Sequence, residues 1–156
     1  MWVLARVKIG DVFRLVLDSH RVGFGQVVGR YGRDAYYFAI FEQPHEADGD
    51  YDIASVVQGE IALLALSLDA LLFHGRWEVV GHAAPPEIHW PTYKESIAPD
   101  VFEAVDHTGK SRRRIGDDEA ASLPNRSVVA PIRVQNAFRA LHGEAPWHEA
   151  YDRLRY

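Results

Sequence analysis

Short apolar runs separated by glycine-containing turns predict β-strands in the first third of the chain. Aliphatic and aromatic residues concentrate in residues 12–17 and 35–41, and a further run at 26–30 lies between them. These residue types favour pleated strands. Residues 18–25 are polar or contain glycine, so we expect them to form the first turn. Because the connections are too short for parallel crossovers, we expect three strands that pair antiparallel.

The middle of the chain carries two competing patterns. Within residues 61–73 the apolar side chains fit both a helical stripe and the alternation of a strand, and periodicity alone leaves both open. A strand-like run follows at 77–81. Three prolines then punctuate an extended stretch at 85–91. One more short strand is expected at 101–105, followed by a polar turn at 107–110 where the sheet should end.

The last quarter of the chain changes to a helical period. Apolar residues recur at i, i+3, i+4 and i+7, with a proline before each set; the sets are Val134, Ala137, Phe138 and Leu141 behind Pro131, and Trp147, Ala150, Tyr151 and Leu154 behind Pro146. Gly143 stands where a left-handed cap would end the first helix. Helices this short need tertiary packing to be stable. We therefore predict an α+β fold: a mainly antiparallel, twisted sheet, SH3-like or barrel-like, with two short C-terminal helices packed on it.

Length and composition indicate one folded unit. The chain has 156 residues, 47% of them hydrophobic, which is enough to bury a core. We expect a single domain over 1–156, mainly β over about 1–106 and helical over about 117–156. The sequence has no cysteine, no secretory signal and no apolar segment of the ~20 residues that a membrane span needs. We expect a cytoplasmic protein with no membrane partner.

Candidate chemical motifs all fall short of a catalytic, cofactor or metal site. The glycines of residues 23–29 are spaced G-x-G-x-x-x-G and open a strand, so they fit a bend or bulge better than a dinucleotide fingerprint. Residues 48–52 lack the later glycine and glutamate of a calcium loop. None of the eight histidines forms an H-E-x-x-H pair, and there is no G-x-S-x-G elbow. We expect a protein that is not an enzyme, with no catalytic residue, metal or cofactor.

Charge is distributed unevenly along the chain. The formal net charge is −5, and the 42 residues 34–75 hold eight acidic residues but no lysine or arginine. A negative patch of this kind can steer a basic partner onto a surface; the simpler alternative is a solvated loop. Five of these acids are our candidate partner-binding residues: Glu42, Glu46, Asp48, Asp50 and Asp52.

A dense basic cluster stands later in the sequence, at Lys110 and residues 112–114. Three acids at 117–119 follow it immediately and can neutralise it. No glycine-rich or aromatic-interleaved platform accompanies the arginines, as nucleic-acid binding would favour. We expect a solvated hairpin or helix approach here, and we do not expect nucleic acid as the partner.

Several segments resemble a known family. The segments KIGDVF at 8–13, GFGQVV at 23–28 and GRWEVVG at 75–81 resemble signatures of the immunity protein 26 family of bacterial polymorphic toxin systems. Residues 38–41 resemble its third strand, and the region of Trp147 resembles its C-terminal helix. The resemblance favours a strand to about Leu68 and then a helical turn ending near Gly75.

The resemblance implies a small cytoplasmic protein that protects the producing bacterium by binding a cognate toxin domain, as in contact-dependent inhibition. Binding of this kind needs a stable scaffold and no chemistry. The residues of the matching motifs, including Gly23 and Gly25, are then scaffold, while specificity lies on surface loops. If the toxin is a basic nuclease, the acidic residues 42–52 would mimic phosphate in its substrate groove.

A second interpretation comes from small SH3-like barrels, which also open with Gly-Asp before an apolar strand. These barrels include nucleic-acid-binding modules and toxin endoribonucleases, which need a basic groove. Residues 1–78 hold seven lysines and arginines against eleven acids, so the charge favours an immunity protein. A small-molecule enzyme with a histidine-containing pocket is a third interpretation.

Overall fold

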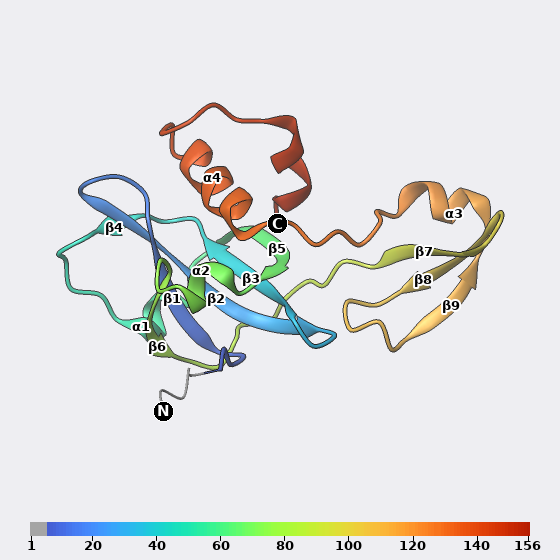
Figure 1. The fold of residues 1–156 in the computed structure, drawn as a ribbon, viewed down its shortest axis with the longest axis horizontal. Coiled ribbons are helices and arrows are strands. Elements are labelled where there is room, and N and C mark those ends of the chain that lie inside the picture. Colours follow the sequence, from blue (N-terminus) through green and yellow to red (C-terminus); the bar gives the residue numbers. More distant parts are fainter. Residues whose placement is uncertain (1–5) are drawn as a thin grey trace.

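Six antiparallel strands form the main sheet of the protein (Figure 1). The computed structural model describes residues 6–156. The strand order is β5-β3-β2-β1-β6, and β4 pairs with the beginning of β2. The strands are β1 (Asp11–Val16), β2 (Arg21–Tyr31), β3 (Ala35–Phe41), β4 (His45–Glu46), β5 (Ile61–Leu68) and β6 (Glu78–His82). The α+β class and the antiparallel pairing of the first three strands are confirmed.

The segment with two competing patterns divides as the family resemblance favours. Its first part is β5, and a single helical turn, α2 (Ala70–Phe73), follows. Gly75, with a φ of 72°, then redirects the chain toward β6. Since β5 pairs with β3 along its length, the alternation of its side chains decides the local structure.

The first turn is shorter than the sequence predicts. Residues 18–25 were expected to be a turn, but β2 begins at Arg21. The Asp18 carboxylate closes the hairpin by accepting hydrogen bonds from the backbone N–H groups of His20 and Arg21, at 2.8 and 2.7 Å. The His20 N–H and the Arg21 guanidinium lower the pKa of Asp18 to about 2. Because this turn is tight, Gly23 and Gly25 lie inside the strand.

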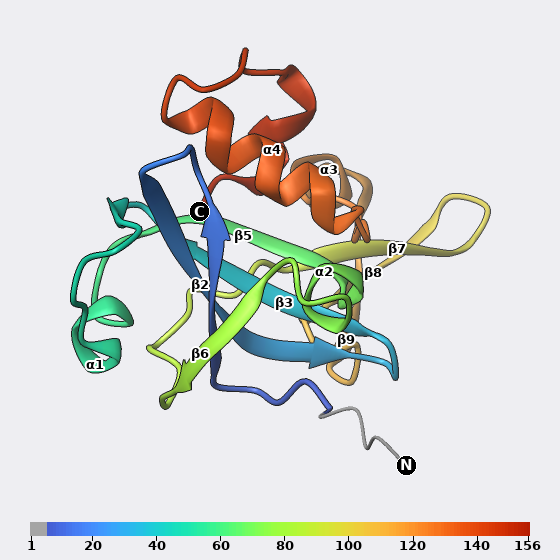
Figure 2. The same ribbon diagram turned by 60° about the vertical axis from the view of Figure 1, so that its left-hand side comes forward.

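The C-terminal helix lies across one face of the main sheet, as predicted (Figure 2). This helix, α4 (Pro131–Leu141), begins with its proline and is followed by Gly143, whose φ is 79°. A short 3₁₀ helix, η1 (Glu149–Leu154), then packs against α4 and β5. Both predicted helices are present, and the second is a 3₁₀ helix.

The glycines of β2 allow the core to close beneath α4. A Cβ atom at Gly23 would overlap the ring of Phe138 from α4, and a Cβ atom at Gly25 would lie 2.5 Å from the Cζ atom of Phe13. Phe13 stacks on Trp77 with ring centroids 4.8 Å apart and an interplanar angle of 8°. Close packing of large rings on a strand needs such side-chain-free positions.

The opposite face of the main sheet is also covered. Phe24 alternates with the two glycines and packs with Val56 at the end of α1 (Ile53–Val56). Ile88 and Trp90 of the proline-rich stretch cover Tyr37 and its neighbours in β3. The sheet is therefore buried on both faces, and its exposed features lie at its edges and strand ends.

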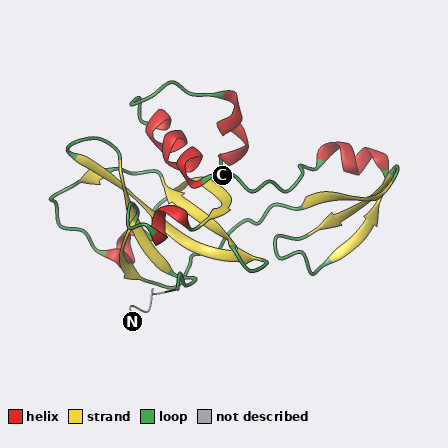
Figure 3. Cartoon of the chain, in the orientation of Figure 1, coloured by secondary structure: helices red, strands yellow, loops and turns green. Residues whose placement is uncertain are grey.

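A second, three-stranded sheet stands beside the main one, where the sequence predicts a single strand and the end of the sheet (Figure 3). It consists of β7 (Tyr93–Ala98), β8 (Val101–Val105) and β9 (Arg112–Ile115), with α3 (Asp117–Ser122) packed on β8. The expectation that the sheet ends after residue 105 is wrong. The outer strands β7 and β9 are short and mostly polar, so their hydrophobic pattern does not reveal them. Pairing with β8 stabilises them as strands.

Arg126 joins the two sheets. Its guanidinium carbon lies 4.0 Å from the ring centroid of Tyr31 at the end of β2 and 4.8 Å from that of Tyr93 in β7. Its Nη1 atom lies 3.5 Å from the Glu95 carboxylate, and its side chain is 6% exposed. A desolvated guanidinium between two rings is worth about 2 kcal/mol or more. This side chain therefore fixes the place of the second sheet.

Replacing Gly23 with alanine is expected to lower the free energy of unfolding by about 1–3 kcal/mol, because the added methyl group overlaps the Phe138 ring. The matched control is Gly116→Ala, where no atom lies within 4 Å of the new Cβ. That change should cost under about 1 kcal/mol. Urea unfolding followed by circular dichroism measures both, and equal stabilities would contradict the packing of α4 on β2.

Replacing Arg126 with alanine is expected to loosen the second sheet more than the main one. Hydrogen exchange should accelerate at least about tenfold for amides of residues 93–115, since losing ~2 kcal/mol of cation–π contact shifts local opening by that order. Amides of β2 and β3 should change much less. Arg126→Lys keeps the charge but not the planar group, so it should restore only part of the protection. Uniform acceleration across both sheets would argue against this role.

Candidate partner-binding site

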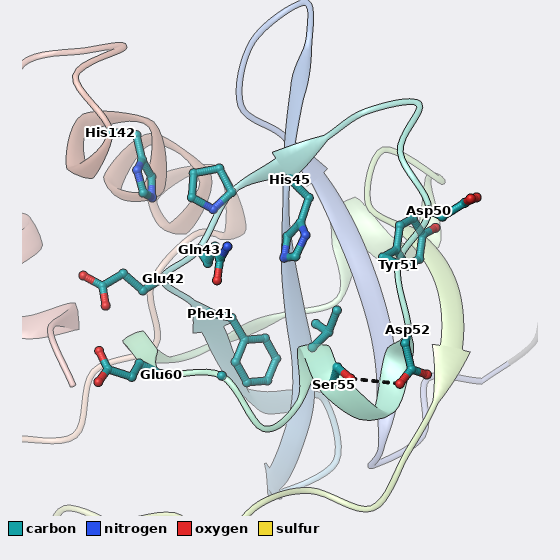
Figure 4. Close-up of a pocket in the computed structure, with 13 residues that line it drawn as sticks. Phe41, Glu42, Gln43, His45, Asp50, Tyr51, Asp52, Ser55, Glu60 and His142 are labelled. Carbon is teal, nitrogen blue, oxygen red and sulfur yellow. Dashed lines mark hydrogen bonds between the residues drawn. The ribbon is translucent and has the colours of Figure 1, made fainter.

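An acidic hollow lies where the chain leaves β3 (Figure 4). Its volume is about 670 Å³, and it is bounded by the residues after β3, by β4, by α1 and by the residue that follows α4. Four carboxylate side chains line it: Glu42, Asp50, Asp52 and Glu60. The imidazoles of His45 and His142 and the rings of Phe41 and Tyr51 also line it. The hollow therefore presents negative charge on a concave surface.

Packing on Phe24 fixes the loop that carries these acids. Phe24 is buried in β2, and the rings of Tyr51 and His45 lie against it with centroids 4.6 and 5.1 Å away. The backbone N–H of Glu42 donates to the carbonyl of Glu60 at 2.8 Å, which ties together the two ends of the segment. The acidic side chains thus project from a loop that is anchored at its middle and at both ends.

The five acids predicted from the sequence are exposed, and within residues 6–156 none of them forms an ion pair; they are Glu42, Glu46, Asp48, Asp50 and Asp52. Asp52 accepts a hydrogen bond from the neutral hydroxyl of Ser55 at 2.9 Å. Exposed carboxylates that form no ion pair leave much of their negative potential unbalanced. This surface is suited to attract cationic groups.

The basic cluster differs, because two of its three arginines, Arg112 and Arg113, form ion pairs in the described residues. Arg112 contacts the carboxylates of Glu95 and Glu103 at 2.5 and 3.0 Å, across the strands of the second sheet. Arg113 pairs with Glu119. The sequence predicted that the acids at 117–119 neutralise the cluster, and Glu119 does so. The pairing of Arg112 with Glu95 and Glu103 was not predicted. The predicted hairpin is present, because residues 112–115 form strand β9, which pairs antiparallel with β8 after the turn at 106–111.

The structure brings together only some of the predicted acids. Glu42, Asp50 and Asp52 line the hollow, whereas Glu46 in β4 and Asp48 in the turn after it are not part of its lining. Glu60 was not among the predicted site residues, although it lies in the same cation-free stretch. No pattern in the sequence links His142 to this stretch, and only the docking of α4 brings it to the hollow.

The acidic surface continues beyond the hollow. A neighbouring depression of about 620 Å³ shares Gly59 and Glu60 with it and adds Glu87 from the proline-rich stretch. No lysine or arginine lines either one. A partner that occupies the hollow would therefore meet further negative charge along one side.

His142 lies on the wall of the hollow and is half-buried. Its ring packs on Phe138 with centroids 4.8 Å apart, and its Nε2 atom is buried with no hydrogen-bond partner. Burial lowers the pKa of His142 below 6.5, although the nearby Glu42 opposes this effect. Burial also lowers the pKa of His107, whose ring stacks on Trp90 at 3.8 Å.

Within the described residues, no group of three or more histidine, aspartate or glutamate side chains is arranged to hold a metal ion. In that same part of the chain, no helix combines the length and apolar character needed to cross a membrane. The side chains that line the hollow include carboxylates, imidazoles, hydroxyls and aromatic rings. This combination suits the binding of basic side chains through charge and ring contacts.

Comparison with known proteins identifies the family. The family model described as immunity protein 26 matches residues 8–112, about two thirds of the chain. The chain belongs to the immunity protein 26 family. The match extends from the residues before β1 to the beginning of β9 and includes the acidic loop, whereas α4 and His142 lie beyond it. No curated protein and no solved structure was found to match.

The lowered pKa values of His107 and His142 predict a loss of stability on mild acidification. Unfolding frees both imidazoles to bind protons near pH 6.5, so the unfolded state takes up more protons as the pH falls through that value. Stability should be level above about pH 7.5 and should fall between about pH 6.5 and 5. Chemical unfolding at a series of pH values measures this dependence.

The variant His142→Gln tests how much this one histidine contributes to the pH dependence of stability. It should show a shallower decline between about pH 6.5 and 5 than the original protein, since one differential proton has been removed. His107→Gln should act in the same way, and the double variant should be shallower than either. A double variant whose stability falls as steeply as that of the original protein would contradict the assignment.

Proposed function

We propose that this immunity protein 26 family member neutralises a cognate polymorphic or contact-dependent toxin by binding it in the cytoplasm of the producing bacterium. Family membership supports the general role. The observation that carries the proposed site is the acidic hollow, whose carboxylates form no ion pair in the described residues, in contrast to the basic cluster of the second sheet, whose Arg112 and Arg113 are already paired. The protein acts in this proposal by occupying its partner, and no bond is made or broken.

The proposed interface centres on the hollow. Glu42, Asp50, Asp52 and Glu60 contact basic side chains of the toxin, and Glu46 and Asp48 extend the surface toward β4. Tyr51 and Phe41 supply ring surface at the base for the apolar stems of arginine or lysine. An interface that combines buried rings with charge complementarity is typical of tight recognition.

The partner that best fits this surface is a basic toxin domain, such as a nuclease whose substrate groove binds phosphate. Several carboxylates on one concave surface offer such a groove the negative charge that it normally finds on a nucleic acid backbone. The long-range attraction would raise the association rate, which protects a cell that must capture the toxin before it acts.

Neutralising the hollow tests this interface. The variant Glu42→Gln/Asp50→Asn/Asp52→Asn/Glu60→Gln removes four exposed charges and should keep the fold, since none of these carboxylates is ion-paired in the described residues. The partner is the toxin domain encoded beside this gene. Its association rate constant at low salt should fall about 10–100-fold, with a weaker salt dependence.

The control variant changes the same net charge elsewhere, through Asp100→Asn/Asp117→Asn/Asp118→Asn/Glu149→Gln, all at exposed positions. Its association rate should change less than about threefold, because these charges are distant from the hollow and screened. Equal losses in the two variants would show that only net charge matters. No loss in either would place the interface elsewhere on the protein.

Cell survival tests the function itself. Cells that express the toxin domain should survive with the original protein and die with the hollow variant, if that variant no longer captures the toxin. A purified protein that retards RNA at physiological salt, or that cleaves it, would instead support the nucleic-acid-binding barrel. Co-elution with the toxin domain and no retardation of RNA is the result expected of an immunity protein.

A further inference from the structure

A second cavity lies at the edge of the main sheet and shares no residue with the acidic hollow. It has a volume of about 450 Å³ and is enclosed by β5, by η1 with the residues after it, and by the connection from α3 to α4. This places it close to the C-terminal end of the chain, between the two sheets (Figure 1). Its volume falls within the range of small-molecule sites.

The backbone builds this cavity by covering an edge strand incompletely. Within the described residues, the outer edge of β5 is bridged at two isolated points, Leu63 with Arg155 and Ser67 with Val129. The Val129 N–H donates to the Leu66 carbonyl at 2.9 Å, which closes one end. The strand residues 64–66 lie between the bridges and line the cavity. Between these two bridges, a short length of the β5 edge has no paired neighbour, and the cavity lies over it.

Hydrogen bonds also fix the other walls. The Lys94 N–H donates to the Pro124 carbonyl at 2.9 Å, joining β7 to the connection before α4. The Tyr156 hydroxyl accepts from the His89 N–H at 2.8 Å. Because elements on every side are tied to one another, the cavity is largely formed before any ligand arrives, as small-molecule sites usually are.

The lining combines apolar surface with positive charge. Leucine, valine, alanine and proline supply half of the lining residues; they include Leu64, Leu66, Pro91, Val129, Ala150 and Leu154. Three arginines, Arg133, Arg153 and Arg155, are the charged side chains of the lining, and no aspartate or glutamate lines it. None of the three forms an ion pair with another residue in 6–156.

The position of Arg133 adds to the positive potential. It lies in the first turn of α4, an 11-residue helix, where the helix dipole already favours a negative charge. Arg155 is held with its guanidinium carbon 4.1 Å from the Trp147 ring centroid. Arg133 and Arg153 are both exposed, so their guanidinium groups can reach a ligand at the mouth. A guanidinium matches the two oxygens of a carboxylate.

We propose that this cavity binds a small organic carboxylate with an apolar body. The carboxylate pairs with Arg133 and Arg153 at the mouth, and the apolar part lies against the side chains of apolar residues that line the cavity, Leu64, Val129 and Leu154 among them. Apolar walls with a few convergent charged groups are the usual composition of a small-molecule site. The proposal does not rest on toxin binding, because this cavity shares no residue with the acidic hollow and meets only the neighbouring depression, at His89 and Tyr156.

Octanoate, octanol and octylammonium test the chemistry, since they share one apolar chain and differ in charge. We expect octanoate to shift the amide resonances of residues 64–66, 129–133 and 153–156 in a saturable one-site titration of ¹⁵N-labelled protein. Octanol should bind at least about tenfold more weakly, and octylammonium should not saturate the site. Equal binding of octanoate and octanol, or octanoate shifts confined to other residues, would overturn the proposal.

Arginine variants test the assignment of the charges. Arg133→Gln/Arg153→Gln should weaken octanoate at least about tenfold and leave the weak binding of octanol unchanged. The matched control, Arg33→Gln/Arg114→Gln, removes two exposed arginines that do not line the cavity and should bind octanoate as the original protein does. If the control loses affinity for octanoate to the same degree, net charge alone explains the effect and the assignment is overturned.

Discussion

The core of this protein depends on two positions in β2 where the fold has no room for a side chain. Gly23 admits the Phe138 ring from α4, and Gly25 admits the Phe13 ring, which stacks on Trp77. The helix can therefore lie close to the sheet and bury the central part of one face. The G-x-G segment of β2 is thus a packing device, and its glycines contact rings where a dinucleotide fingerprint would contact phosphates.

Burial of both sheet faces determines where the protein can interact. The face opposite α4 is covered by α1 and by the proline-rich stretch, so neither face offers a broad binding surface. The exposed features lie where strands end or lack a neighbour. The acidic hollow follows the end of β3, and the second cavity lies on the uncovered edge of β5. A rigid scaffold of this kind can vary its loops without disturbing its core.

Electrostatic pairing separates the two charged regions that are most prominent in the sequence. Arg112 and Arg113 lie on β9, and cross-strand and helix partners neutralise them. The acids after β3 lie on a loop with no cation nearby in the sequence. Arg14 reaches the Ala47 carbonyl of this loop, but the acids themselves form no ion pair in the described residues. Paired arginines therefore help to hold the second sheet together, whereas the acids after β3 are exposed to a partner.

The sequence by itself determined the elements whose signals are local. Alternation and aromatic content predicted β1 and β3, and the spacing of Val134 to Leu141 between Pro131 and Gly143 predicted α4. The acidic loop was also visible, because the absence of cations is a property of composition. Family resemblance was needed to divide residues 61–73, whose apolar pattern fits a strand and a helix equally well.

Only the tertiary structure decided what depends on distant partners. The spacing of hydrophobic residues does not predict the second sheet. Glu95 and Glu103 stabilise Arg112 only once the strands are paired. His142 joins the acidic hollow through the docking of α4, and Arg133 and Arg153 meet β5 through the return of the chain after that helix. Side chains far apart in sequence converge through packing, and no local pattern records which of them will meet.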